Sequence, residues 1–135
     1  MTHLLDNSVY VRIPQHKRVA EAVDMLARHG HVGRCSMFEL EALYSTRSHD
    51  YEQVRHRLHA FELVPTHQAD WDRATDVMSQ LADSGRHRAV ALPDLIVAAV
   101  AERTQLTVLH YDRDFEVIAS MTGQSVQAVV PLGSI

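Results

Sequence analysis

Short apolar runs alternate with longer amphipathic segments along the chain. The short runs lie between turn-forming residues, which is typical of strands, whereas the longer segments repeat apolar residues every three or four positions, which is typical of helices. We expect strands over residues 3–5, 31–36, 106–111 and 126–132, an extended piece over 62–66, and helices over 15–29, 37–47, 50–61, 71–82, 93–104 and 114–123.

This alternation of strands and helices predicts an α/β fold with a mainly parallel central sheet. The sequence contains no internal repeat, no low-complexity segment and no linker rich in Gly, Pro or Ser, so we expect residues 1–135 to form a single domain. Ligands of such sheets gather beyond the carboxyl ends of the strands, near a reversal in strand order. The residues that directly follow the strands are therefore the candidates for a functional site.

Composition narrows the class of protein further. Hydrophobic residues make up 46% of the chain and charged residues 22%, which is ordinary for a globular protein and argues against disorder. No apolar run approaches the roughly 20 residues that span a bilayer, and no secretion signal precedes the first strand, so we expect no membrane association and a cytoplasmic location. The net charge of −4 argues against a basic nucleic-acid coat protein.

Acidic residues follow two predicted strands and stand near the starts of two predicted helices. Each of them alone also fits a turn or a helix cap. Taken together, their placement favours convergence at one edge of the sheet. These residues are Asp6, Asp112 and Asp114 after strands, and Glu39, Glu41 and Asp94 near helix starts.

Converging carboxylates repel one another unless they take up protons or bind a cation. Oxygen ligands without cysteine favour Mg²⁺ or Mn²⁺, and the single cysteine, Cys35, offers no zinc pair. Such ions align a phosphodiester and activate an attacking water, so no serine or cysteine nucleophile is required. The negative net charge of the chain is consistent with an enzyme that cleaves phosphodiesters at such a metal site.

Four stretches carry a family resemblance that covers nearly the whole chain. In sequence order they are LLDNS at 4–8, SMFELEALYSTR at 36–47, RHRAVALPDLIVAAVAE at 86–102 and LTVLHYDRDFEVIA at 106–119. In these blocks the chain resembles the PIN-domain ribonucleases, and more closely the VapC-type toxins of bacterial toxin–antitoxin pairs.

The resemblance implies a three-layer PIN-like fold and a Mg²⁺-dependent endoribonuclease, with Mn²⁺ as a possible substitute, that acts on tRNA, rRNA or mRNA. It also implies a small VapB-type antitoxin as partner, and a homodimer. Ser8 matches the hydroxyl residue that supports the first aspartate or the substrate. The acidic quartet carried over as catalytic residues and metal ligands is Asp6, Glu39, Asp94 and Asp112.

Two choices within this quartet rest on local reasoning. Residues two apart on a helix point about 200° apart, so only one of Glu39 and Glu41 can face the ion. We expect Glu39, on the assumption that Leu40 and its helical neighbours Leu43 and Tyr44 take the core side. We likewise expect Asp112, directly after its strand, rather than Asp114, which is kept as a supporting or alternate ligand.

Further residues have candidate roles at the site and beyond it. Arg88 precedes the third block and is a candidate for gripping an RNA phosphate. Asn7 stands where the family commonly has threonine, and its role is open. The helical regions 15–29 and 36–61, together with Val9, Val11 and Ile13, carry more apolar residues than a small sheet needs. An antitoxin segment or a second copy of the chain could cover them, or they could complete the core.

Two alternatives remain at the level of the sequence. The first is a catalytically inactive PIN-like module that binds an antitoxin and co-represses their promoter. The second is a receiver-like domain, which also carries aspartates at strand ends but requires a lysine after a late strand. Residues 106–115 contain no lysine, which disfavours the receiver.

Overall fold

The computed structural model describes residues 1–135 and contains one five-stranded sheet in which all neighbouring strands are parallel. The strand order is β3-β2-β1-β4-β5. The expected α/β class with a parallel sheet is therefore confirmed. The strands are β1 (His3–Leu5), β2 (Val32–Arg34), β3 (Glu62–Leu63), β4 (Thr107–His110) and β5 (Val126–Ala128).

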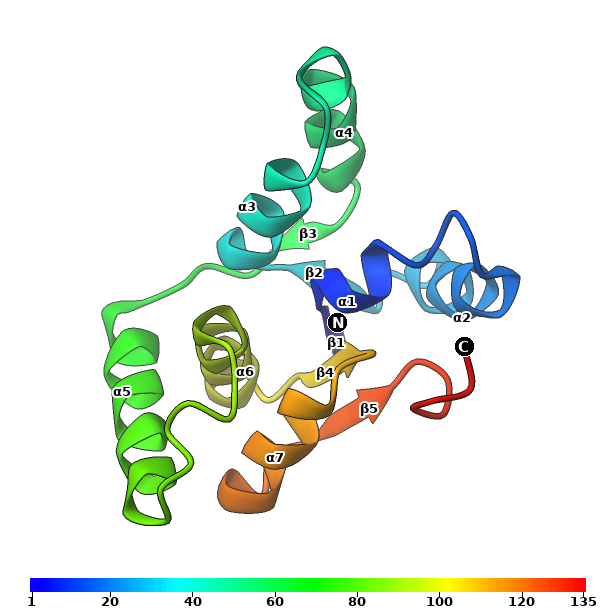
Figure 1. Ribbon diagram of the computed structural model, residues 1–135. Coiled ribbons are helices and arrows are strands. Elements are labelled where there is room, and N and C mark those ends of the chain that lie inside the picture. Colours follow the sequence, from blue (N-terminus) through cyan, green and yellow to red (C-terminus); the bar gives the residue numbers. More distant parts are fainter.

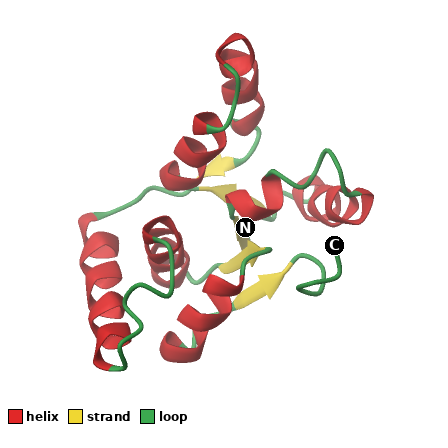
Figure 2. Cartoon of the chain, in the orientation of Figure 1, coloured by secondary structure: helices red, strands yellow, loops and turns green.

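Helices cover both faces of this sheet, as the expected three-layer arrangement requires (Figure 2). Figure 1 shows α5 and α6 side by side on one side and α2 on the other, while α3 and α4 form an arm that stands out from the β3 edge. None of the helices combines the length and apolar character that crossing a bilayer requires. The helices are α1 (Asn7–Tyr10), α2 (Lys17–Arg28), α3 (Ser36–Tyr44), α4 (Tyr51–Leu58), α5 (Gln68–Asp83), α6 (Leu92–Thr104) and α7 (Arg113–Thr122).

The core is one cluster of 27 buried apolar residues drawn from both layers of helices and the sheet. Leu4 and Leu5 of β1 and Val108 of β4 have no exposed surface because these central strands are covered on both faces. In α6 every residue from Asp94 to Ala101 is buried. A helix that is apolar on all sides belongs in the interior, and α6 lies between α5 and the sheet (Figure 1).

Two local features go beyond the predicted elements. Residues 7–10 form the short helix α1, because the Asp6 carboxylate caps its start by accepting a hydrogen bond from the backbone N–H of Ser8. The helix expected from Trp71 begins earlier, at Gln68, and the Trp71 side chain is half exposed, not buried as its size suggests.

A buried ion pair fastens the start of α5 to the end of α6. Asp70 is only 1% exposed, and its Oδ1 accepts a hydrogen bond from Arg103 Nε at 2.8 Å. Its Oδ2 accepts from the backbone N–H of His67 at 2.9 Å. Burial alone would raise the pKa of Asp70, but these hydrogen bonds and the guanidinium charge outweigh burial and hold that pKa below its usual range.

We expect Asp70→Asn to lower the free energy of unfolding by about 2 kcal/mol at neutral pH, the typical worth of a charge-assisted hydrogen bond. A carboxyl whose pKa is lower in the folded state stabilises the protein above its unfolded pKa, and this contribution is lost as the pH falls through the folded pKa. Urea unfolding of both proteins across the acid range should therefore show the deficit shrinking with acidity.

The matched control for this prediction is Asp72→Asn, at an exposed position of the same helix. It should change the free energy of unfolding by less than about 0.5 kcal/mol. A deficit in Asp70→Asn that stays constant down to the acid transition would contradict the assigned ion pair.

Candidate metal centre

The carboxyl ends of β1 and β4 lie side by side where the strand order reverses. The chain runs outward from β1 to β2 and β3, and then from β4 to β5 on the other side. β1 and β4 pair along their length, and the backbone N–H of Asp6 extends the pairing by donating to Leu109 O at 3.1 Å. This reversal is the position at which parallel sheets bind ligands.

Asp6 is held at this edge by backbone hydrogen bonds, which leave one of its oxygens unpaired. Its Oδ2 accepts from the Ser8 N–H at 2.9 Å, and its Oδ1 is buried without a hydrogen-bond partner. Ser8 Oγ in turn accepts from the backbone N–H of Tyr111 at 2.9 Å. Ser8 therefore connects the loop after β1 to the loop after β4.

Three further aspartates meet at the starts of α6 and α7. One carboxylate oxygen each from Asp94, Asp112 and Asp114 lies within 4.8 Å of the others. Asp112 caps α7, its Oδ1 accepting from the Asp114 N–H at 2.9 Å. Asp114 Oδ2 accepts from the Ala91 N–H at 2.9 Å, which fastens the start of α6 to the start of α7. Both members of the expected pair, Asp112 and Asp114, thus lie in the cluster.

The structure contradicts the choice of Glu39 over Glu41. Glu39 Oε1 lies 2.9 Å from His59 Nε2, and Glu39 Oε2 lies 3.5 Å from Arg34 Nε, so its carboxylate is paired with side chains of β2 and of the segment after α4. Glu41 Oε1 is buried without a hydrogen-bond partner, and the charges of Asp6 and Asp112 act on it. Glu41 is therefore the glutamate that faces the cluster.

The reason for the error is the orientation of α3. Of the residues expected on the core side, Leu43 is buried, but Leu40 is 61% exposed and Tyr44 is 94% exposed. The other buried residues of the helix are Phe38 and Ala42. Relative to the expected orientation, the buried face of the helix has shifted, and Glu41 comes to the sheet edge.

Burial and mutual repulsion raise the pKa values of three of the carboxyls, those of Asp6, Glu41 and Asp94. Burial is the largest cause for Asp94, followed by a hydrogen bond with Asp114 and the charges of its acidic neighbours, and together they raise its pKa to about 9. Burial and the charges of Asp6 and Asp112 raise the pKa of Glu41 to about 7. The pKa of Asp6 is also raised, chiefly by burial, against the effect of its hydrogen bonds with Ser8.

These residues fit a hard divalent cation. Asp6 Oδ1, Glu41 Oε1 and Asp94 Oδ2 are all buried and without partners, which is costly for polar atoms unless something binds them. The donor set is entirely carboxylate oxygen, the chemistry that magnesium and manganese prefer. A cation would also remove the repulsion that raises the pKa values.

A family model for the PIN domain matches residues 4–121. The chain belongs to the PIN domain family. It is 40% identical to the ribonuclease VapC21 of Mycobacterium tuberculosis, with 98% of this chain and 96% of that protein covered. It is 38% identical to the ribonuclease VapC51 of the same organism, with 100% of this chain and 98% of that protein covered.

Solved structures of the same fold include toxin–antitoxin complexes. The DNA-bound VapBC complex from Salmonella typhimurium matches with a TM-score of 0.78 at 17% identity, covering 96% of this chain and 99% of that chain. VapBC-5 from Mycobacterium tuberculosis matches with a TM-score of 0.63 at 25% identity, covering 93% of this chain and 95% of that chain. The resemblance to PIN domains and VapC proteins is thereby confirmed.

Two other residues of this PIN domain belong to the segments that carry the carboxylates. Arg88 is exposed in the loop that leads to Ala91 and α6. His110, the last residue of β4, is fully buried and hydrogen-bonds the backbone N–H of Asp112 through Nδ1 at 3.1 Å. Sequence reasoning missed His110, although a polar residue inside an otherwise apolar strand, two positions before Asp112, is a detectable signal.

We expect the stability of the cation-free protein to fall as the pH rises from the acid range towards about 9. Asp94 binds its proton more tightly in the folded state, so its contribution is complete below the unfolded pKa and is lost as the pH rises through the folded pKa. In chelator at alkaline pH, Asp94→Asn should raise the melting temperature by at least ~3 °C, equivalent to roughly 1 kcal/mol.

With Mn²⁺ the wild type should have the higher melting temperature of the two. The ion should stabilise the wild type more than Asp94→Asn, because only the wild type keeps the full set of carboxylates. Asp76→Asn, at an exposed position of α5, is the control and should follow the wild type. A wild-type melting temperature that does not change with pH in chelator would be incompatible with the assigned repulsion.

Proposed function

We propose that this PIN domain, residues 1–135, is a cytoplasmic Mg²⁺-dependent endoribonuclease, with Mn²⁺ as a substitute, and the toxin of a toxin–antitoxin pair. The observation that carries the proposal is the convergence of buried, unpartnered oxygens from Asp6, Glu41 and Asp94 beside Asp112 and Asp114. Similarity to relatives named ribonucleases over nearly the whole chain supports the choice of reaction.

The ion would be held by Asp6, Glu41, Asp94 and Asp112. Asp114 would keep two of these ligands, Asp94 and Asp112, in position. When bound, the ion supplies positive charge at the scissile phosphodiester and acidifies a water molecule. Low solvent exposure strengthens the attraction of these carboxylates for a cation, so a bound ion would favour the deprotonated forms of Asp6, Glu41 and Asp94. Asp114 keeps the starts of α6 and α7 together through Ala91, so that Asp94 and Asp112 stay aligned.

An RNA substrate must approach carboxylates that repel its phosphates, so a nearby cationic side chain is needed to position it. We assign this role to Arg88, which is exposed at the approach to α6. Ser8 donates its backbone N–H to Asp6, and its Oγ accepts from the backbone N–H of Tyr111, which connects the loops after β1 and β4. The RNA class, whether tRNA, rRNA or mRNA, is decided by contacts outside this cluster.

Glu41→Gln and Asp94→Asn should each lower RNA cleavage by at least ~100-fold, since each removes a carboxylate that would hold the ion whose positive charge stabilises the transition state. Both should also relieve growth arrest when the protein is expressed. The matched control is Glu39→Gln, because Glu39 pairs with His59 and Arg34 away from the cluster. Cleavage is measured on purified RNAs with Mg²⁺, with and without chelator.

The outcomes separate the candidate functions. Loss of cleavage in Glu39→Gln with full activity in Glu41→Gln would reverse the assignment of the glutamates. A wild-type protein that binds an antitoxin but cleaves none of several RNAs in the presence of Mg²⁺ would favour the catalytically inactive module.

The antitoxin partner has a candidate docking groove beside α1. This groove has a volume of about 470 Å³ and lies against α1, α3 and α4. Its lining is mainly apolar, with Val11 43% exposed, and it carries a single guanidinium, that of Arg57. We propose that an apolar segment of a VapB-type antitoxin lies in it. The solved VapBC complexes of the same fold support such a partner. A homodimer is proposed as well.

Val11→Asp should weaken the binding of the antitoxin encoded beside this gene by at least ~10-fold, because it places an unpaired charge in an apolar contact. Met25→Asp is the matched control, since Met25 is 68% exposed on α2 and does not line the groove. Titration calorimetry with the purified antitoxin measures both. Equal affinity in the two variants would place the antitoxin elsewhere.

A further inference from the structure

His110 makes two hydrogen bonds from a position with no solvent exposure. It ends β4, and its Nδ1 lies 3.1 Å from the backbone nitrogen of Asp112. Its Nε2 lies 3.1 Å from Oε1 of Glu116, one turn into α7. The ring also packs against Phe115, with 5.2 Å between ring centroids. Both ring nitrogens are therefore used, and neither contacts water.

The partners of His110 determine which ring nitrogen carries the proton. A backbone N–H can only donate, so Nδ1 must present its lone pair to Asp112. The proton of the neutral ring is then on Nε2, where it is donated to the carboxylate of Glu116. The opposite tautomer would set two donors against each other at Asp112 and two acceptors against each other at Glu116.

The Nδ1 acceptor of His110 fixes the backbone of Asp112, whose carboxylate belongs to the candidate metal centre. The backbone of Asp112 is extended, with φ −148° and ψ 127°, and its own Oδ1 accepts from the Asp114 N–H. Its backbone N–H is thus fixed by His110 on one side and its carboxylate by α7 on the other. Without the first contact, a buried N–H would lose its partner in the turn between β4 and α7.

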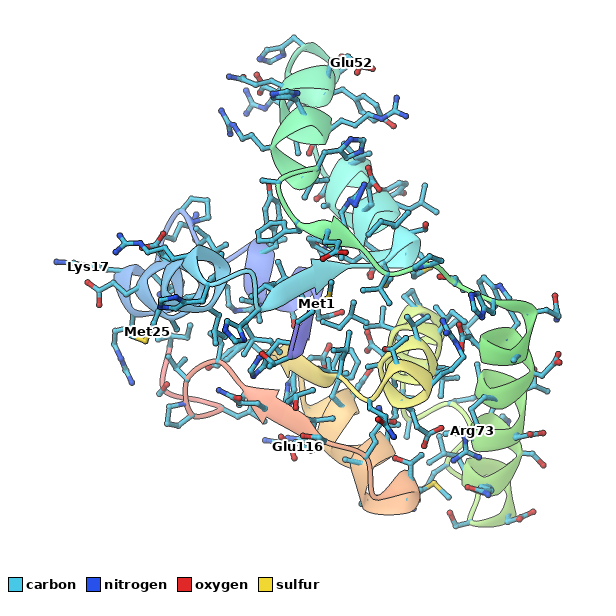
Figure 3. All side chains as sticks on the ribbon, turned by 180° about the vertical axis from the view of Figure 1, so that it is seen from behind. Met1, Lys17, Met25, Glu52, Arg73 and Glu116 are labelled. Atoms are coloured by element: carbon cyan, nitrogen blue, oxygen red, sulfur yellow. The ribbon has the colours of Figure 1, made fainter.

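We propose that His110 is a positioning residue, which holds the candidate ligand Asp112 through Nδ1 while Glu116 fixes its tautomer through Nε2. The proposal rests on the proposed function for the role of Asp112. Contacts of this kind, one step removed from the ion, typically change metal affinity by 10–100-fold when they are removed. Glu116, labelled in Figure 3, is half exposed, so the arrangement reaches from the buried strand to the surface of α7.

The tautomer can be tested directly in the wild-type protein. Two-bond ¹H–¹⁵N correlation spectra of ¹⁵N-histidine-labelled protein identify which ring nitrogen is protonated, and the His110→Asn spectrum assigns the signal. We expect Nδ1 to be unprotonated and Nε2 to carry a proton. A proton on Nδ1 would overturn the proposal without reference to any activity.

Two substitutions separate positioning from simple packing. Asparagine places its Oδ1 where histidine has Nδ1, whereas glutamine places its terminal nitrogen near Nε2 and leaves Asp112 without an acceptor. Both remove the buried ring, so both should lower the melting temperature to a similar extent. Calorimetry with Mn²⁺ alone should show His110→Gln weakened by at least roughly 10-fold, and His110→Asn within a few-fold of the wild type.

The results also separate the positioning role of His110 from the proposed metal centre on which it rests. Equal Mn²⁺ affinity in the wild type and in His110→Gln would overturn the positioning role, as would equal weakening in both variants. A wild type that binds no Mn²⁺ would instead overturn the proposed metal centre. Should His110→Gln fail to fold, the tautomer spectrum of the wild type still decides the positioning proposal.

Discussion

Negative charge is concentrated at one edge of the sheet, and the surrounding structure has to hold it there against repulsion. The carboxylates that face each other come from the loop after β1, from α3, from the start of α6 and from the loop after β4. Burial removes the water that would screen them, which is why the pKa of Asp94 rises to about 9. Backbone N–H groups, from Ser8 to Asp6, from Asp114 to Asp112 and from Ala91 to Asp114, supply the opposing attraction.

The hydrophobic core stabilises this arrangement from behind. Residues 94–101 of α6 are all buried, so the packing of this helix opposes movement of Asp94 when its neighbours repel it. The ion pair of Asp70 and Arg103 fastens the other end of α6 to α5. The stability of the fold and the reactivity of the site are therefore connected, because a tightly packed helix carries the least favourably placed carboxyl. A charge cluster of this kind in a PIN domain therefore requires a well-packed helix such as α6 to hold it in place.

Much of this site could be predicted from the sequence, because strand ends are readable from local pattern. The alternation of short and long apolar segments gives the parallel sheet, and Asp6 and Asp112 then fall at adjacent strand ends. The identity of the glutamate could not be read in the same way. The segment around Glu41 is apolar on nearly all sides, so sequence alone does not show that Tyr44 points to solvent. The partners of His110 are close in sequence, at Asp112 and Glu116, but only the conformation of the turn between β4 and α7 brings both of them to the ring.

The separation of the cluster along the chain has a consequence during synthesis. Asp6 and Glu41 emerge from the ribosome early, whereas Asp112 and the amide donors that fix it come more than seventy residues after Glu41. β4, which completes the hydrogen bonding of Asp6 through Leu109, arrives equally late. A fragment that ends before β4 therefore has acidic residues but no closed sheet edge to gather them. Translation that stops before β4 therefore yields a chain without an assembled site, whether or not an antitoxin is present.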